Sequence, residues 1–413
     1  MNTTLKKITG SFRALNHRNF NLFISGQAVS TIGTWMQNIA QPWLVLELTN
    51  NPLLLGIVVS AQTMPQMILS FYAGVIIDRI PKRKILIITQ SCYALLAFTL
   101  GFLTSMHLVR YEHVLIVALA FGFLNTIDMP TRQAFMIDLV GKEDLMNAIA
   151  FNSTIFNVSR IIGPTIAGIL IKTTGIATCF YINAFSYVPV VIQLLRIDTP
   201  IHKVKSTTKP EKIWKEMVEG IRFVLSNSKM RIIFFLFLII SIFTINFSVL
   251  NPVLAKKDFL SDAGGLSFLM TSMGIGALVA ALSIIFLNLN KSTMKLILSS
   301  SFMLAFFITA IGFTKNITMA GISLAFVGYS MILFSTSVNT MLQLESDDIH
   351  RGRVMAIYFF VFVGITPIGA MFAGALSKIY GARFTYLLSG LIGLLGCLIT
   401  FAWIRFQNRR IHV

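Results

Sequence analysis

The sequence predicts an all-α polytopic membrane protein with 12 transmembrane helices in two pseudo-symmetric six-helix bundles. Hydrophobic residues make up 55% of the 413 residues and charged residues only 12%, about half the charged share of a soluble protein. Apolar runs of roughly 20 residues, the length that crosses a bilayer, recur along almost the whole chain. Secreted, fibrous, disordered and cytosolic-enzyme classes are therefore excluded together.

The apolar runs are expected to be helices, because the strands of a membrane barrel would be shorter and would alternate in polarity. Their approximate limits are 20–47, 53–77, 85–105, 113–136, 147–171, 175–196, 231–254, 265–288, 296–314, 317–342, 354–377 and 384–404.

The positive charges fix the expected orientation of these helices. Lys and Arg fall mostly in the gaps between the runs, about 26 on the side that holds both termini and about 7 on the other. Both termini are therefore expected in the cytoplasm, and the protein in the bacterial cytoplasmic membrane. The net charge of +18 is therefore explained by positive residues in cytoplasmic loops. No nucleic-acid partner is expected, because a nucleic-acid-binding protein would gather these residues on one face.

A long polar stretch divides the spans into six and six. The expected domains are an N-terminal bundle (1–196), a cytoplasmic linker (197–230) and a C-terminal bundle (231–413). Within the linker, an apolar stripe at helical spacing predicts an amphipathic helix on the cytoplasmic membrane face. The stripe consists of Ile213, Met217, Ile221 and Val224. A plain tether between the halves is the alternative.

Glycines repeat at a fixed offset of 206 residues, which is about half the chain. Gly163, Gly168 and Gly175 recur as Gly369, Gly374 and Gly381. Two six-span halves related by a parallel repeat are the layout of one large class of transporters.

The segment after the second span carries the most specific motif. Gly74 is followed by Asp78 and Arg79, and then by Lys82 and Arg83, in the pattern Gly-x-x-x-Asp-Arg-x-x-Lys-Arg. Glycine lets a neighbouring helix approach closely, and Asp78 can accept from a helix N-terminus in the other half. An ordinary positively charged loop is the alternative reading.

This segment resembles the signature between spans two and three of the major facilitator superfamily, with Pro81 in place of the usual glycine. The resemblance implies that the motif latches the two halves together in the outward-facing state. The corresponding loop of the second half, from Asn288 to Lys295, lacks the Asp-Arg pair.

Further motifs point to one branch of the superfamily. Residues 123–135, followed by Asn152 and Arg160, and Arg351-Gly-Arg353 resemble the enterobactin-exporter-like branch, also called transmembrane secretion effectors. Because that branch contains siderophore and drug exporters, the resemblance implies efflux by an antiporter. The expected gating residues are Gly74, Asp78, Arg79, Arg83, Arg132, Arg351 and Arg353.

A glycine-proline pair lies in the fifth span. Proline removes one backbone hydrogen bond and bends a helix, and glycines allow close packing and sliding. In the superfamily such a motif is associated with exporters, although kinked glycine-bearing helices are common in membranes. The expected hinge consists of Gly163, Pro164, Gly168 and Gly369.

Charges within the spans are scarce, and each is a functional candidate because a buried charge needs a partner or water. Asp128 is either a protonatable carboxylate or the partner of Arg132 or Arg79. Glu47 is a second proton-coupling candidate, or it reaches the outer interface. Arg160 either locks the bundle or attracts an anionic substrate.

Polar residues recur every three to four positions along the first span, which places them on one helix face that lipid would penalise. Together with residues of the fourth, fifth, seventh and tenth spans they are expected to contact substrate. The set is Gln27, Thr31, Thr34, Asn38, Gln41, Asn125, Arg160, Asn246, Tyr329 and Asn339. Hydrogen bonding between helices is the alternative for any one of them.

The sequence predicts a secondary active transporter that exports a small amphipathic, drug- or siderophore-like molecule by alternating access, in exchange for protons. No phosphate-binding loop, buried histidine or reactive cluster stands out, so no cofactor, metal or enzyme activity is expected. The expected partners are the small-molecule substrate, protons and the lipid bilayer, with the protein a monomer. The alternatives are a gradient-independent facilitator or lipid flippase on the same fold, and a non-transporting membrane receptor or enzyme.

Overall fold

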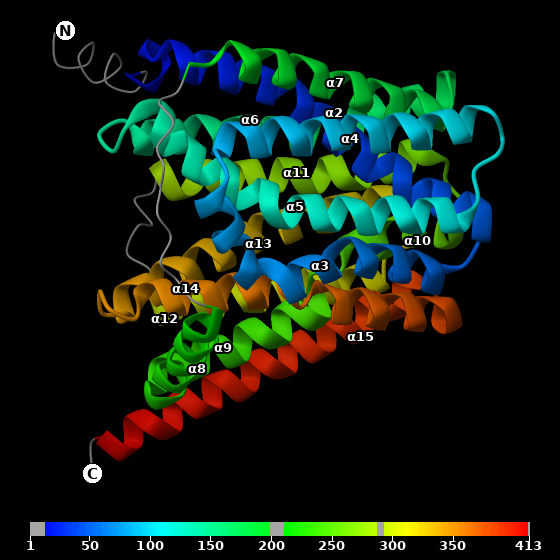
Figure 1. The fold of residues 1–413 in the computed structure, drawn as a ribbon. Coiled ribbons are helices and arrows are strands. Elements are labelled where there is room, and N and C mark those ends of the chain that lie inside the picture. Colours follow the sequence, from blue (N-terminus) through cyan, green and yellow to red (C-terminus); the bar gives the residue numbers. More distant parts are fainter. Residues whose placement is uncertain (1–12, 199–209, 287–292, 412–413) are drawn as a thin grey trace, which may run out of the picture. The chain divides into compact units, whose positions relative to one another are not determined.

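The structure is a computed structural model that describes the backbone of residues 13–198, 210–286 and 293–411. Within these ranges it describes all side chains except those of 70–78, 210–216, 285 and 408–411. Every regular element in the described ranges is a helix (Figure 1). The predicted all-α class is therefore confirmed.

The residues group by their contacts into two compact units. Unit 1 comprises residues 1–41 and 69–207, and unit 2 comprises 42–68 and 208–413. The chain segment 42–68 thus belongs to unit 2, where the Ser60 hydroxyl donates to the carbonyl of Pro367 at 2.9 Å. The predicted division of the spans at 197–230 stays a prediction.

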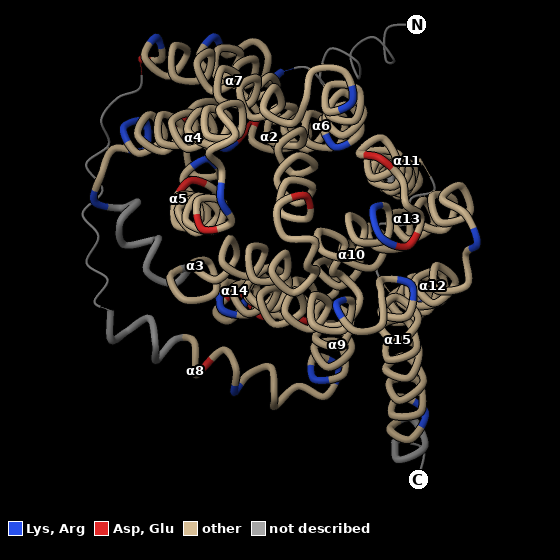
Figure 2. The backbone as a smooth tube through the Cα atoms, turned by 90° about the vertical axis from the view of Figure 1, so that its right-hand side faces the viewer, with Lys and Arg blue, Asp and Glu red and all other residues tan. Residues whose placement is uncertain are grey.

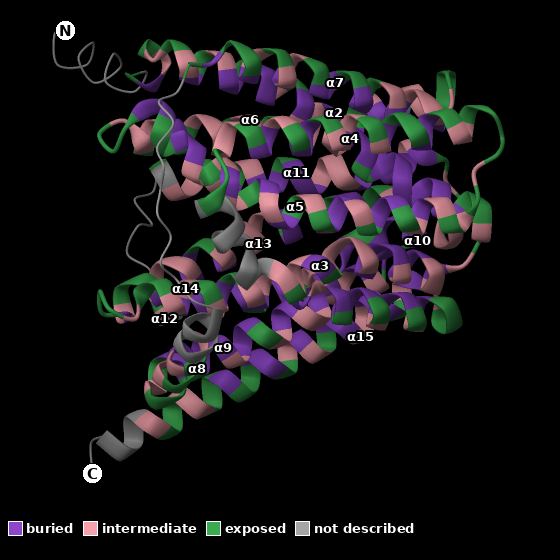
Figure 3. Cartoon of the chain, viewed as in Figure 1, coloured by how far each residue is buried: buried purple, intermediate pink, exposed green. Residues whose placement is uncertain are grey.

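Unit 1 is built from helices joined by short turns. Its elements are η1 (Arg13–Asn16), the first part of α2 (Arg18–Thr49), the last part of α3 (Pro52–Arg79), α4 (Lys82–Ser105), α5 (Tyr111–Val140), α6 (Leu145–Thr173) and α7 (Ile176–Arg196). Few positions along these helices are charged (Figure 2). Buried and exposed positions occur within each helix (Figure 3).

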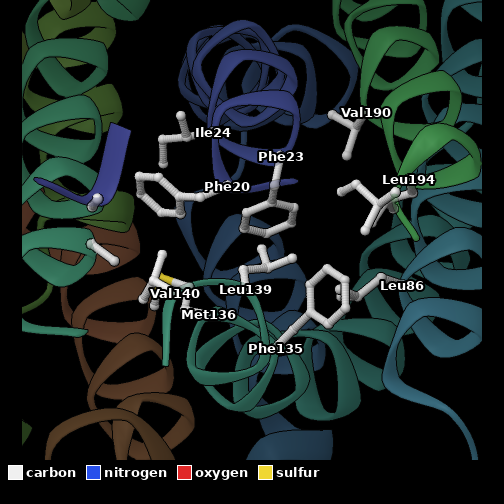
Figure 4. Packing of buried hydrophobic residues seen from close by; sticks show 13 residues of the cluster. Phe20, Phe23, Ile24, Leu86, Phe135, Met136, Leu139, Val140, Val190 and Leu194 are labelled. Carbon is white, nitrogen blue, oxygen red and sulfur yellow. The ribbon is translucent and has the colours of Figure 1, made fainter. Parts of the chain in front are cut away.

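A buried apolar cluster joins α2, α4, α5 and α7 in unit 1 (Figure 4). Phe23 of α2 meets Phe135 of α5 edge to face, with ring centroids 5.6 Å apart. Such aromatic pairs contribute about 0.5–1.5 kcal/mol beyond their buried area. Phe135 lies three residues after Arg132, so the cluster fixes the turn of α5 that carries this arginine.

Besides the last part of α2 and the first part of α3, unit 2 contains the remaining helices and three π-helical turns. Its elements are α8 (Pro210–Ser226), α9 (Ser228–Ile239), η2 (Ile240–Thr244), α10 (Phe247–Val253), η3 (Leu254–Asp258), α11 (Ala263–Phe286), α12 (Met294–Gly312), α13 (Ile317–Glu345), α14 (Arg351–Phe359), η4 (Phe360–Gly364) and α15 (Thr366–Ile411). The turns η2, η3 and η4 are π-helical. Single π-helical turns often mark functional sites.

The internal repeat is visible in the backbone. Gly175 and Gly381 both have positive φ, 90° and 80°, with ψ of 168° and 169°. Only glycine adopts this conformation readily. Gly381 therefore divides α15 into two helices. Helices α6 and α14 begin at Leu145 and Arg351, which is the same offset of 206 as the glycines.

Ten helical segments of the described chain are long and apolar enough to cross a membrane. One of them, Arg351–Gln407, covers the last two predicted spans, and the first predicted span is not among the ten. The polar stripe of that first span explains its lower hydropathy. The protein is therefore a multi-span helical protein, while the count of 12 spans and the cytoplasmic termini stay predictions.

The linker helix exists as α8, and its predicted place on the membrane face stays a prediction. Val224 is buried, whereas Ile221 is 41% exposed. The side chain of Ile213 lies outside the described residues. Gly220 faces α14, where a Cβ would lie 2.9 Å from that of Arg353. The same face of α8 carries Glu219, which pairs with Arg353 at 2.9 Å.

Candidate functional site

A buried carboxylate in unit 1 is surrounded by hydrogen-bond donors. Asp128 of α5 is 2% exposed. One carboxylate oxygen accepts from the hydroxyl of Thr89 and, at 2.8 Å, from the amide of Gln90. The other oxygen accepts from Nε of Arg132. An ionised carboxylate has about four acceptor sites, so the protein fills most of them.

The local sequence explains this arrangement. Asp128 and Arg132 are four residues apart on one helix, so their side chains lie on the same face. Thr89 and Gln90 come from α4, which packs against α5. Of the two predicted ion-pair partners of Asp128, the structure has Arg132. Arg79 is exposed at the end of α3 and forms no ion pair within the described chain.

Aromatic rings lie along α4 and α7 near the carboxylate. The ring of Tyr93 stacks on that of Tyr187 at 5.5 Å and lies 4.8 Å from that of Phe121. The Tyr187 hydroxyl is 3.1 Å from the hydroxyl of Thr34 on α2. The first-span stripe is thereby connected to the helix that faces the Asp128 site.

The predicted polar stripe of α2 does not have one common environment. Thr31 and Thr34 are half-buried, and their hydroxyls donate to the carbonyls of Gln27 and Ser30. Gln27 is buried, and its side-chain oxygen has no partner. Asn38 is exposed, and it makes no hydrogen bond in the part of the chain that the structure describes.

Hydrogen bonds within α2 and between α2 and α7 hold the C-terminal end of the stripe. The Gln37 amide donates to Gln41 at 3.3 Å, and the Asn183 amide of α7 donates to Gln37 at 2.6 Å. Sequence reasoning missed Gln37 and Asn183. Gly33 allows this approach of α2 and α7, since a Cβ there would lie 2.7 Å from the Asn183 side-chain oxygen.

Arg160 of α6 is 9% exposed and lies over an aromatic ring. Its guanidinium carbon is 5.8 Å from the centroid of the Trp35 ring, within the range of a cation–π contact. The Trp35 ring in turn meets Phe156 edge to face at 5.4 Å. Within the described residues Arg160 forms no ion pair and no hydrogen bond.

Three of the predicted hinge residues follow this arginine on α6. Gly163 packs so tightly on α2 that a Cβ would come within 2.4 Å of the Trp35 Cβ. Pro164 and Gly168 are buried in α6. In unit 2, Gly369, the fourth predicted hinge residue, also packs tightly. A Cβ there would lie 2.4 Å from the side-chain oxygen of Asn246.

The other predicted substrate residues are scattered over both units. Asn125 is exposed on α5. Asn246 follows the π-helical turn η2, and its side-chain oxygen is buried without a partner. Asn339 accepts from Gln343 at 2.7 Å, and Tyr329 is half-buried on α13.

The predicted gating residues have different neighbours. For Gly74 and Asp78 the structure describes only the backbone. Arg83 donates to the carbonyls of Leu194 and Leu195 at 2.6 and 2.7 Å, which satisfies the C-terminal end of α7. In unit 1, Lys82 pairs with Asp138 at 2.8 Å. In unit 2, Arg351 pairs with Asp348, also at 2.8 Å.

Glu47 is not part of a buried site. It is exposed at the end of α2, and it accepts from the Trp43 indole at 2.7 Å. The ammonium of Lys256 lies 5.2 Å from the Trp43 ring centroid. This placement favours the alternative in which Glu47 reaches the outer interface.

Comparisons with known proteins show the family to which the chain is related. The family described as transmembrane secretion effector matches residues 9–410. The chain is 27% identical to the staphyloferrin A transporter of Staphylococcus aureus, over 89% of this chain and 92% of that protein. It is 25% identical to the multidrug efflux pump Tap of Mycolicibacterium fortuitum, over 86% and 88%.

The fold also matches solved transporter structures. The nucleoside transporter NupG superposes with a TM-score of 0.76 at 13% identity, covering 94% of this chain and 99% of that one. At this identity the likeness shows the fold alone.

Proposed function

The chain belongs to the transmembrane secretion effector family of the major facilitator superfamily, and from this membership we propose that it exports a small amphipathic molecule in exchange for protons. Like its relatives, it is a transporter of the cell membrane. It is not an enzyme. The proposal includes alternating access between two six-span halves, cytoplasmic termini and a monomeric state.

The observation that carries proton exchange is the enclosed carboxylate of Asp128. A charge in an apolar span is retained only when it is paired or hydrated. Asp128 is paired with Arg132 and accepts from Thr89 and Gln90. Protonation would cancel the attraction between Asp128 and Arg132 and release α4 donors. This change of contacts is the event that we propose to couple to substrate release, with Glu47 as the second candidate site.

Substrate contact is proposed for polar side chains that are exposed within the helices. Asn38 and Asn125 are both exposed on long apolar helices, and an amide facing lipid would lose its hydrogen bonds. We therefore expect them to face a water-filled cavity. A drug- or siderophore-like substrate is supported by the relatives named for staphyloferrin A transport and multidrug efflux.

A gradient-independent facilitator is the second candidate, and one observation favours it. The Asp128–Arg132 pair is already formed and buried, so it can serve as a permanent structural link. In that case Asp128 never takes up a proton during transport.

Proton-linked transport in everted membrane vesicles tests the proposal. Vesicles with an acidic interior receive siderophores, macrolides or dyes, and a pH-sensitive dye reports collapse of the gradient. We expect collapse by the native protein and its loss in Asp128→Asn. The matched control is Asp138→Asn on the same helix, which removes a half-exposed paired carboxylate and should keep the coupling. Substrate movement without proton movement would favour the facilitator.

A further inference from the structure

Arg160 is a buried cation without an anion. Two other arginines of the described chain with little exposed surface have carboxylate partners: Arg132 pairs with Asp128, and Arg353 pairs with Glu219. Arg160 is 9% exposed, and the structure shows no ion pair or hydrogen bond for it within the described residues, only a cation–π contact with the Trp35 ring. A ring face attracts the charge but cannot accept all the N–H groups of a guanidinium.

The position of Arg160 along its helix excludes a simple escape to the membrane surface. Helix α6 begins at Leu145, so Arg160 lies about 22 Å along the axis at about 1.5 Å per residue. A side chain at that depth is well inside an apolar layer about 30 Å thick. Its burial by neighbouring helices also prevents it from reaching the headgroups by extension.

The surroundings of the guanidinium suit an organic molecule rather than a bare inorganic ion. Trp35 lies below it at 5.8 Å, and Phe156, which is 50% exposed, meets the Trp35 ring. Asn38 follows Trp35 by three residues on α2 and is exposed, so it shares that helix face. The Arg160 guanidinium and the Asn38 amide therefore offer polar contacts beside the apolar rings of Trp35 and Phe156.

Residues toward the start of α6 connect this site with its predicted cytoplasmic end. Asn157 and Ser153 precede Arg160 by three and seven residues, and they are half-buried and exposed. The Asn157 amide donates to the Ser153 carbonyl at 2.8 Å and does not turn toward the arginine. A polar track therefore follows one face of α6 up to the unpaired guanidinium.

We propose that Arg160 binds a carboxylate of the substrate, and that Trp35 and Phe156 contact the substrate's flat apolar part. This inference rests on the proposed export function and names its substrate class as organic anions. Bidentate pairing of guanidinium and carboxylate supplies the hydrogen bonds that the protein leaves unmade. Exchange of one such anion for one proton moves two charges in the same electrical sense.

Binding of matched acids and amides tests the proposal. The full chain is placed in nanodiscs of neutral phosphatidylcholine, and its intrinsic fluorescence is titrated with 2-naphthoate and with 2-naphthamide. We expect the acid to bind the native protein about 10- to 100-fold more tightly than the amide. Arg160→Gln should lose this preference and keep the affinity for the amide. Arg160→Lys should keep part of it, because it retains the charge without the fork.

Arg222→Gln is the matched control, since it removes one exposed positive charge from α8 and should not change either affinity. Thermal unfolding without ligand provides the second readout. A structural lock would make Arg160→Gln less stable, whereas an unpaired guanidinium predicts an equal or higher unfolding temperature. The acid should raise the unfolding temperature of the native protein and of Arg222→Gln, but not that of Arg160→Gln.

Three results would overturn the inference. The first is a native protein that binds the acid no better than the amide, or not at all. The second is Arg160→Gln with a lower unfolding temperature and equal loss of both ligands. The third is an acid preference that the native protein shows in phosphatidylcholine nanodiscs but loses in phosphatidylglycerol nanodiscs. Because this preference depends on Arg160, its loss would identify a lipid headgroup as the anion that Arg160 binds. If the inference fails alone, Arg160→Gln still exchanges neutral dyes for protons; if proton exchange fails alone, the acid still binds.

Discussion

Breaking the pair between Asp128 and Arg132 should destabilise unit 1 more than any exposed ion pair does. Asp128 is 2% exposed, and the Arg132 side chain is 21% exposed. Removing one partner of a buried pair costs about 3–5 kcal/mol. Because the Arg132 left behind by Asp128→Asn keeps some solvent, we expect about 3 kcal/mol for that variant and slightly more for Arg132→Gln, which leaves the buried carboxylate unpaired. The double variant should lose only about 2 kcal/mol, since neither charge is then left alone.

The assay is a double-mutant cycle on the free energy of unfolding in mixed detergent micelles. The expected coupling energy is about 3 kcal/mol or more, the amount by which the two single losses exceed the double loss. The control cycle uses Lys82 and Asp138, whose side chains are 24% and 33% exposed, and should give at most about 1 kcal/mol. Equal coupling energies in the two cycles would refute the reasoning that burial makes the Asp128 pair special.

Gly163→Ala should lower the free energy of unfolding by about 1–3 kcal/mol, because its Cβ would lie 2.4 Å from that of a neighbouring tryptophan. Gly352→Ala is the control and should not lower it, because a Cβ at Gly352 has nothing within 4 Å. Equal effects of the two variants would exclude close packing as the cause. Glu219→Gln should speed proteolytic cleavage near α8, because it breaks the pair with Arg353. The double variant with Arg353→Gln should be cleaved no faster than Glu219→Gln alone. A hydrogen bond from the backbone N–H of His350 lowers the pKa of the Asp347 carboxyl. The stabilising effect of the ionised Asp347 is therefore present above about pH 4 and is lost as pH falls through the lowered pKa. Unfolding temperatures of the native protein and Asp347→Asn should differ at pH 6 and converge at low pH, and a constant difference would contradict this.

The sequence indicated the main charged positions because a charge is conspicuous in an apolar span. Asp128 and Arg132 also lie four residues apart, so their contact follows from helix geometry alone. Thr89, Gln90 and Tyr93 were not predicted as part of the site. They belong to another helix, and which of its faces meets α5 depends on packing that a single helical pattern does not contain.

The polar stripe of the first span illustrates the same limit. Helical spacing placed Gln27 to Gln41 on one face, but Gln41 bonds to Gln37 while Asn38 is exposed. The partner that draws the stripe into the interior is Asn183 of α7, more than 140 residues away by the chain. The glycine repeat was more informative, because Gly175 and Gly381 adopt a backbone conformation that other residues rarely take.

The most direct test of proton exchange is proton release by the purified protein on substrate binding. A compound that collapses the gradient in vesicles is added to the protein in weakly buffered solution, and a pH indicator counts the protons. The account predicts release of about one proton per bound molecule by the native protein and by Asp138→Asn, but none by Asp128→Asn. Equal release by all three proteins, or binding without any release, would contradict the assignment of the exchanged proton to Asp128.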